Sequence, residues 1–208
     1  MVENPWCKIP LEDYELHMQH DIVGQAQLLN NLTRKYLVKH HPEHILFLGI
    51  SGGNGLANIN TDKVKSIVGI DINQAYIAET EKRFGNKLKQ LRLLNLDINT
   101  AEESLTKANL VWGALIIEYV DIDRCFKFIS NNTAADAKLI FTIQSNNGIE
   151  SISQTGIESL NAIEELFKVV EADDLISQAA NNGFRLNDRE ENILPNGKSF
   201  ITIEFVKH

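Results

Sequence analysis

A glycine-rich turn lies between two short apolar runs near the start of the chain. The first run covers residues 45–48, and the second covers residues 66–70 and ends in Asp71. Four glycines follow the first run within seven positions, at Gly49, Gly52, Gly53 and Gly55. Both runs have the length of buried parallel strands. A glycine turn after one strand, with an acid at the tip of the next, is typical of a nucleoside site in which the carboxylate binds the ribose hydroxyls.

Strand-like and helix-like patterns alternate along the middle of the chain, which predicts an α/β fold with a doubly wound sheet. The expected strands cover residues 45–48, 66–70, 88–94, 110–117 and 137–143. The expected helices cover residues 21–39, 56–59, 73–84, 160–170 and 173–183. Two more are expected to begin near Thr100, where Thr100 and Glu103 form a capping box, and near residue 121. Ligands of such sheets lie at the carboxyl ends of the strands.

The last part of the chain has a different pattern. Residues 185–194 and 200–206 alternate between apolar and polar side chains, and Pro195, Asn196 and Gly197 between them form a turn. We therefore expect an antiparallel hairpin that completes a mostly parallel sheet of seven strands.

Composition narrows the class of protein. The 208 residues suit one domain, 43% are apolar, and the formal net charge is −8. That charge, with no basic cluster, argues against nucleic-acid binding. No apolar run reaches the length of a membrane span, no signal peptide is recognisable, and the two cysteines are far apart. We expect a cytoplasmic protein without a metal site, and its oligomeric state stays open.

Two segments are candidates for covering a ligand. Residues 1–40 comprise a terminal stretch rich in aromatic and imidazole groups, including Tyr14 and His17, and then a helix; this region is a candidate lid. Residues 145–166 follow the fifth strand and contain many Ser, Asn, Gln and Thr side chains. This second region is a candidate substrate cap, and its polarity favours a polar small acceptor over a membrane lipid.

Four motifs resemble those of the class I S-adenosylmethionine-dependent methyltransferases. They are L-F-L-G-I-S-G-G-N-G at 46–55, G-I-D-I-N at 69–73, N-L-D-I-N at 95–99 and A-L-I-I-E-Y-V-D at 114–121. The likeness covers about residues 14–208, and the terminal hairpin is similar to the family's antiparallel seventh strand. D-Y-E-L-H-M and V-G-Q near the N-terminus resemble a small bacterial subgroup of undefined substrate. The resemblance implies a Rossmann-like methyltransferase fold and S-adenosylmethionine as cofactor, and with the polar cap region we expect a small-molecule acceptor.

The resemblance also implies roles for single residues. Asp71 would bind the ribose hydroxyls and Asp97 the adenine amino group. Other positions would contact the methionine part, the adenine ring or the underside of the cofactor: Tyr14, Gly49, Ser51, Gly53, Ile72, Ile98, Leu115 and Ile116. Two positions depart from the family pattern, because Phe47 stands where an acid is usual and Ser51 where a glycine is usual.

Methyl transfer from a sulfonium requires alignment more than any one catalytic group. Candidates near the methyl position are His17, Glu118 and Tyr119. His17 could be a base because imidazole titrates near neutral pH. Glu118 could instead cap the following helix, and Tyr119 could pack beside the cofactor.

Other functions use the same residues. An NAD-dependent dehydrogenase would also use the glycines and Asp71, but Ser51 replaces a glycine of its fingerprint and there is no Tyr-x-x-x-Lys pair. A hydrolase elbow around Ser51 would have only the terminal His208 as a later histidine. A protein that binds the cofactor in a degenerate site without transfer is the non-enzyme alternative.

Overall fold

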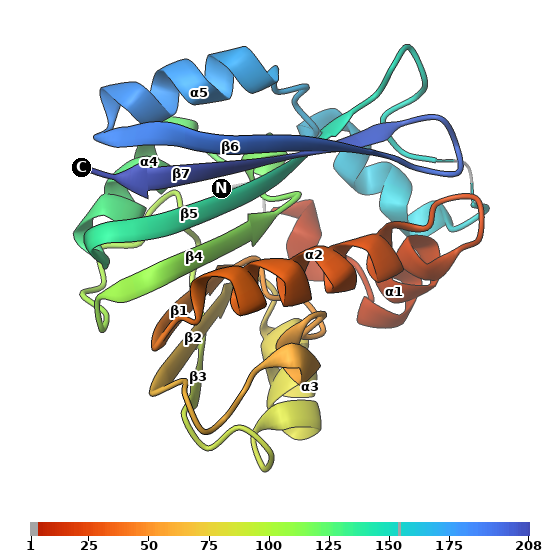
Figure 1. Cartoon of the computed structure of the whole chain (residues 1–208). Coiled ribbons are helices and arrows are strands. Elements are labelled where there is room, and N and C mark those ends of the chain that lie inside the picture. The colour runs from red at the N-terminus through yellow and green to blue at the C-terminus, as the bar shows by residue number, and fades with distance from the viewer. Residues whose placement is uncertain (1–3, 154) are drawn as a thin grey trace.

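Seven strands form one mixed sheet at the centre of the protein (Figure 1). The computed structural model describes residues 4–153 and 155–208, so parts of the expected lid and cap, residues 1–3 and Gln154, lie outside the described residues. The strands follow the spatial order β3-β2-β1-β4-β5-β7-β6. Their bounds are β1 His44–Leu48, β2 Ser66–Asp71, β3 Leu91–Asn95, β4 Ala108–Ala114, β5 Thr133–Ser145, β6 Phe184–Ile193 and β7 Ser199–Lys207. The fold prediction is confirmed.

Strands β1 to β5 pair in parallel, and the C-terminal hairpin is antiparallel. The chain runs from β1 outward to β3 and then returns to β4 on the other side of β1. The strand order therefore reverses between β1 and β4, which is where doubly wound sheets bind ligands. The expected C-terminal hairpin is present, and its second strand, β7, inserts between β5 and β6.

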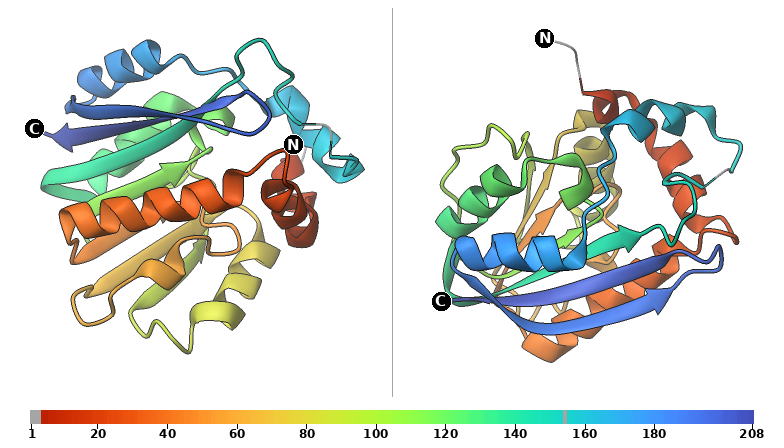
Figure 2. Two further views of the ribbon diagram at one scale, coloured as in Figure 1. Left: turned by 45° about the vertical axis from the view of Figure 1, so that its right-hand side comes forward. Right: turned by 90° about the horizontal axis from the view of Figure 1, so that it is seen from above.

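Helices cover both faces of the sheet (Figures 1 and 2). The α-helices are α1 Leu11–Gln19, α2 Gln25–His40, α3 Gln74–Phe84, α4 Ile122–Asn131 and α5 Ala172–Asn181. The 3-10 helices are η1 Pro5–Lys8, η2 Leu56–Asn58, η3 Ile117–Tyr119 and η4 Glu158–Leu166. None of the described helices is long and apolar enough to cross a membrane.

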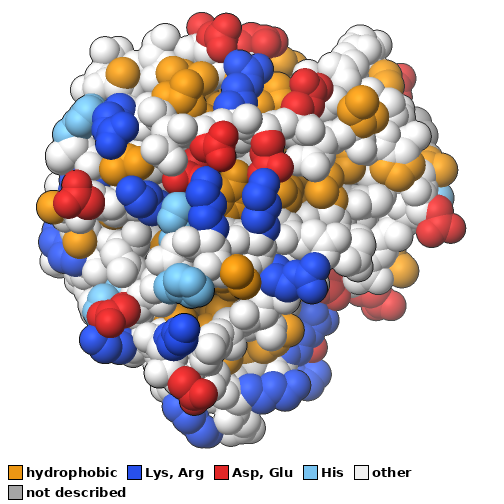
Figure 3. Space-filling model, in the orientation of Figure 1, with side chains coloured by type: hydrophobic (Ala, Val, Ile, Leu, Met, Phe, Trp, Pro, Cys, Tyr) orange, Lys and Arg blue, Asp and Glu red, His pale blue; other side chains and the backbone are white. Residues whose placement is uncertain are grey.

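Alternating side chains of β1 divide the core into two layers. Ile45 and Phe47 join a cluster with α2 and α3, whereas Leu46 and Leu48 join a cluster with α4 and α5. Basic and acidic side chains lie side by side on one outer face (Figure 3), where Lys35 of α2 pairs with a glutamate of β6 at 2.6 Å. Exposed pairs of this kind contribute little stability, so the buried layers hold the sheet.

Several helix predictions are wrong. Helix α1 lies in a stretch where no helix was expected, and α2 begins after Gly24, in a left-handed conformation, rather than at Asp21. The expected helix at Thr100 is absent from residues 101–107, because the Asn132 side chain bonds that segment instead. It accepts from the Leu105 N–H at 2.7 Å and donates to a nearby carbonyl at 3.1 Å. Residues 158–166 form a 3-10 helix that ends before 170.

Candidate functional site

The glycine-rich turn leaves β1 at the point where strand order reverses. Gly49 and Gly53 have φ of 65° and 83°, and Ser51 has φ of 50°. Left-handed backbone is easy for glycine and unusual for serine. A Cβ at Gly49 would lie 3.2 Å from the side chain of Ile116, so glycine permits a close approach between the turn and the end of β4.

Asp71 anchors this turn from the tip of β2. Its Oδ2 accepts the N–H of Ser51 at 2.9 Å, and its Oδ1 accepts the N–H of Asn73 at 2.9 Å. Burial raises the pKa of Asp71, and these backbone N–H groups oppose the shift. Each carboxylate oxygen retains a second lone pair, so Asp71 can hold the turn and still accept hydrogen bonds from a ligand.

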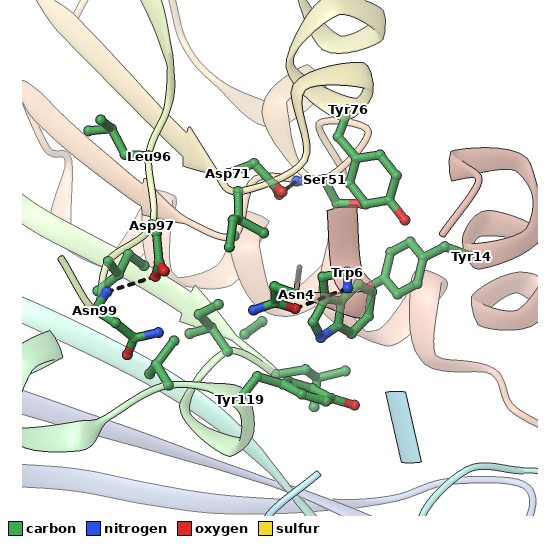
Figure 4. A pocket seen from close by; sticks show the side chains of 17 residues that line it. Asn4, Trp6, Tyr14, Ser51, Asp71, Tyr76, Leu96, Asp97, Asn99 and Tyr119 are labelled. Atoms are coloured by element: carbon green, nitrogen blue, oxygen red, sulfur yellow. Dashed lines mark hydrogen bonds between the residues drawn. The ribbon is translucent and has the colours of Figure 1, made fainter. Parts of the chain in front are cut away.

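A hollow opens between the turn and the carboxyl ends of β2, β3 and β4 (Figure 4). We call it the first hollow. Its empty space is about 670 Å³, part of it open to solvent. It is lined by nine of the ten residues expected to bind the cofactor: Tyr14, Gly49, Ser51, Asp71, Ile72, Asp97, Ile98, Leu115 and Ile116. Tyr119 also lines it.

The N-terminal segment covers the first hollow. Asn4 and Trp6 of this segment line it opposite Asp71 (Figure 4). The Asn73 side chain donates to the carbonyls of Trp6 at 2.8 Å and Ile9 at 3.2 Å, while its oxygen caps α3. The cover is therefore fastened to the same corner that carries Asp71.

A second hollow adjoins the first at the glycine turn. The two share Tyr14, Gly49, Ser51 and Ala114. Gly53 lines the second hollow rather than the first, and a Cβ there would come within 2.7 Å of the Phe84 ring, so this glycine serves packing.

The second hollow has one pair of charged residues among its described lining, Glu15 of α1 and Arg83 of α3. Arg83 Nη2 donates to Glu15 Oε2 at 3.0 Å, and Arg83 Nη1 donates to the Gly52 carbonyl at 3.3 Å. Sequence reasoning missed both residues: α1, which carries Glu15, was not expected to be a helix, and Arg83 on the expected helix 73–84 was given no role. Phe47, at the position where the family has an acid, lines the same hollow.

Three polar atoms of the first hollow have no hydrogen-bond partner in the described part of the chain. They are Trp6 Nε1, Ser51 Oγ and the Tyr76 hydroxyl. Buried polar groups are normally paired. Three unpaired groups around one hollow favour a polar ligand that completes them.

The three catalytic candidates differ in position. Tyr119 lines the first hollow and a neighbouring third hollow. His17 lines the third hollow only, and its Nδ1 lies 2.9 Å from Thr155 Oγ1. Burial, with charge repulsion from Lys198, lowers the pKa of His17 to about 4, so the ring is neutral at pH 7.

Glu118 lines none of these hollows. It is fully buried, and its Oε1 accepts the N–H of Gln144 at 2.8 Å. Burial raises its pKa to about 7. The alternative role as a cap for α4 is wrong, because Asp121 caps that helix by accepting the N–H of Arg124.

Comparisons with known proteins test the fold. No protein-family model and no curated protein matches the sequence. Magnesium protoporphyrin IX methyltransferase from Synechocystis PCC 6803, solved with bound S-adenosylmethionine, superposes with a TM-score of 0.74 at 11% identity, over 100% of this chain and 99% of that one. N-methyltransferase NodS from Bradyrhizobium japonicum WM9, with S-adenosyl-l-homocysteine, gives 0.71 at 14% identity over 99% of both chains.

The chain has the fold of class I S-adenosylmethionine-dependent methyltransferases. At these identities the likeness concerns the fold alone. The [4+2]-cyclase SpnF superposes with a TM-score of 0.68 at 12% identity, over 86% of this chain and 79% of that one. The methyltransferase fold therefore also carries a protein named for a different reaction, and the function has to be argued from the site.

Proposed function

We propose that the protein is an S-adenosylmethionine-dependent methyltransferase acting on a small molecule. The adenosine lies in the first hollow and the amino-acid tail lies in the second, with the sulfonium beside Gly49 and Ser51. The observation that carries the proposal is that the two hollows adjoin at the glycine turn, with Asp71 in the first and the Glu15–Arg83 pair in the second.

The charges of the site favour this cofactor over a dinucleotide. The charged lining of the two hollows, within the described residues, consists of three carboxylates and one guanidinium: Asp71, Asp97, Glu15 and Arg83. S-adenosylmethionine has a sulfonium, an ammonium and a carboxylate, so its net positive charge complements this lining. The diphosphate of NAD would meet an excess of negative charge.

The segment after the glycine turn supports the same choice. Dinucleotide-binding proteins place the diphosphate at the N-terminus of a helix that follows the turn. Here Gly55 leads into η2, a three-residue 3-10 helix. So short a helix provides little dipole for a diphosphate.

Glu15 supplies the acid that Phe47 does not. A zwitterionic tail needs one anion for its ammonium and one cation for its carboxylate, and the pair on α1 and α3 provides both. Binding would require Glu15 and Arg83 to exchange part of their mutual contact for the tail. Both side chains are about one-third exposed, so this exchange costs little.

The chain's own residues bind, orient and exclude water. Asp71 holds the ribose, the Glu15–Arg83 pair holds the tail, and the segment carrying Trp6 covers the adenosine. When bound, the cofactor supplies an activated methyl group for in-line displacement, and alignment of two reactants alone can be worth roughly 7–11 kcal/mol. Glu118 is too enclosed to touch a substrate, so its role is to fix the end of β5 through Gln144.

Calorimetric titration tests the proposal. S-adenosylmethionine should bind with a dissociation constant in the micromolar range, and S-adenosylhomocysteine should compete for the same site. NAD at the same concentration should give no heat. Binding of NAD without binding of S-adenosylmethionine would overturn the assignment.

A further inference from the structure

A third hollow adjoins the first where a methyl acceptor would have to lie. The two share Trp6, Tyr14, Leu115 and Tyr119. Its remaining walls come from α1, from the start of α2, from the end of β5, and from the loop and η4 of the candidate cap with Phe167 just after it. Its empty space, including the open mouth, is about 490 Å³.

Aromatic rings form the wall nearest the first hollow. Trp6 and Tyr119 pack edge-to-face with their centroids 5.0 Å apart, and Tyr119 packs in the same way on Phe167 at 5.7 Å. Leu160 and Ile163 of η4 are almost fully buried beside them. The cap sequence is polar, yet it presents aliphatic side chains to this hollow, which favours a flat apolar ligand.

The lining of the third hollow is uncharged. None of its described residues is Asp, Glu, Lys or Arg, and its polar members include His17, Gln25 and Gln144. Gln25 donates to the Gln144 side chain at 3.0 Å. An ion entering this hollow would lose water without gaining a counter-ion, which is costly.

Two buried titratable groups, Lys198 and Glu118, contact residues of the lining, and the Oε2 of Glu118 has no partner among the described residues. Lys198 is fully buried and donates to the Ser151 carbonyl at 2.8 Å and to Ser153 Oγ at 3.1 Å. Burial lowers the pKa of Lys198 to about 8, so it is mainly cationic at pH 7 and repels an ammonium. Glu118 is bonded to the backbone of Gln144 on the opposite side.

The third hollow also lacks a strong base. The lowered pKa of His17, about 4, makes its imidazole a weak proton acceptor. Burial raises the pKa of Tyr14 and of Tyr119, so neither is a phenolate at pH 7. An acceptor bound here has to be nucleophilic without first losing a proton.

We propose that the methyl acceptor is a flat, uncharged heteroaromatic compound whose ring nitrogen takes the methyl group. This proposal rests on the proposed function. The nitrogen lone pair forms the new bond to the methyl carbon, the carbon–sulfur bond breaks, and its electron pair goes to sulfur. Sulfur becomes neutral, the positive charge passes to the ring nitrogen, and no proton moves. The faces of Trp6, Tyr119 and Phe167 stabilise that charge as it develops.

Four two-ring probes of similar shape test the proposal: isoquinoline, the cationic amine tetrahydroisoquinoline, the anion isoquinolinecarboxylate, and naphthol, which must lose a proton to react. Binding is measured by calorimetry with and without S-adenosylmethionine, and methylation by mass spectrometry. Isoquinoline should bind at least about tenfold more tightly than either ion, because an unpaired buried charge is costly. It should also be the probe that gains a methyl group.

A pair of variants locates the binding site. Ile152→Asp places a charge in the third hollow and should weaken isoquinoline binding about tenfold or more, because the ring would bury an unpaired carboxylate. S-adenosylmethionine binding should stay within about twofold, because Ile152 lies outside the first two hollows. Ile149→Asp, on an exposed part of the same loop, should change neither affinity.

Three results would overturn the proposal: tighter binding of either ion, faster methylation of naphthol, or no binding of isoquinoline by protein that binds S-adenosylmethionine. Failure of the proposed function gives a different result. The protein would not bind S-adenosylmethionine, while the measurements without cofactor would still decide whether the hollow prefers the neutral ring.

Discussion

The floor of the site and its cover are built in different ways. The floor consists of the strand ends of β1, β2 and β4 with the glycine turn, and its contacts are mostly backbone bonds, such as the one from the Ile50 N–H to the Ile70 carbonyl at 2.9 Å. The cover consists of η1, α1 and the cap that includes η4. Side-chain bonds between distant parts of the chain hold it, as from Ser159 to Asp13 at 2.7 Å. Substitutions in the floor should therefore lower cofactor affinity or stability more than substitutions in the cover.

Asp71→Ala should have the largest effect. It removes a buried carboxylate that anchors the turn and, in our proposal, binds the ribose. Losing two charged hydrogen bonds at about 1.5–3 kcal/mol each predicts a loss of S-adenosylmethionine affinity of about 100-fold or more. Calorimetry measures it. An unchanged affinity would show that Asp71 is not a cofactor ligand, and circular dichroism controls for loss of fold.

Glu118→Gln should change how stability depends on pH. Burial raises the pKa of Glu118 to about 7, compared with about 4.3 when unfolded. Between these values the folded protein holds a proton that the unfolded chain has lost, so the wild-type unfolding free energy falls as pH rises, by up to about 1.4 kcal/mol per unit. The Glu118→Gln variant has no carboxyl group to titrate, so its unfolding free energy does not show this decrease.

Urea unfolding between about pH 5 and about pH 7.5 measures this effect, given the linear dependence of stability on denaturant. The lowered pKa of His17 gives a slope of opposite sign in the same range, but it is present in both proteins and cancels in the difference. The stability of the variant relative to wild type should rise with pH. Parallel curves would contradict the assignment.

Glu15→Gln tests the cover. The Glu15–Arg83 pair is partly exposed, so stability should change by less than about 1 kcal/mol. Affinity for S-adenosylmethionine should fall about tenfold, because the tail loses its anion. Adenosine, which has no tail, should bind as before. Lys82→Gln, on the exposed side of α3, is the matched control. Equal losses for both ligands would argue against the tail assignment.

Ser159→Ala should have the smallest effect. It removes the bond from η4 to Asp13 of α1 and should lower the unfolding free energy by about 1 kcal/mol or less. Hydrogen exchange should show faster opening of residues 158–166, with unchanged protection in β1 and β4. Faster exchange throughout the sheet would show that the cover is not a separate layer. Ser177→Ala, which removes a hydrogen bond at an exposed position of α5, serves as control.

The difference between floor and cover explains what the sequence could predict. Strand periodicity, glycine spacing and Asp71 are local signals, and they predicted the sheet and the turn. The motif resemblance implied nine of the residues that line the first hollow. Helix α1 has a weak pattern because its inward residues, such as Tyr14 and His17, line hollows rather than fill the core. Its missed assignment concealed Glu15.

The failed helix at Thr100 has a similar cause. Asn132, far along the chain, provides the hydrogen bonds that a helix would have provided. No local pattern reports such a distant partner. The apolar inner surface of the cap was missed for the same reason. Leu160 and Ile163 form it by packing against Ile9 and Trp6, which are distant in the sequence.

The wall shared by the first and third hollows limits how the two ligands can be tuned. Trp6, Tyr14 and Tyr119 face both spaces. A substitution at any of them alters both compartments at once, so its kinetic effects on donor and acceptor cannot be separated. Selection for a new acceptor is therefore expected to act on the far wall of the third hollow, at Ile152 and Ile163. Substitutions there can change acceptor specificity without changing the affinity for the methyl donor.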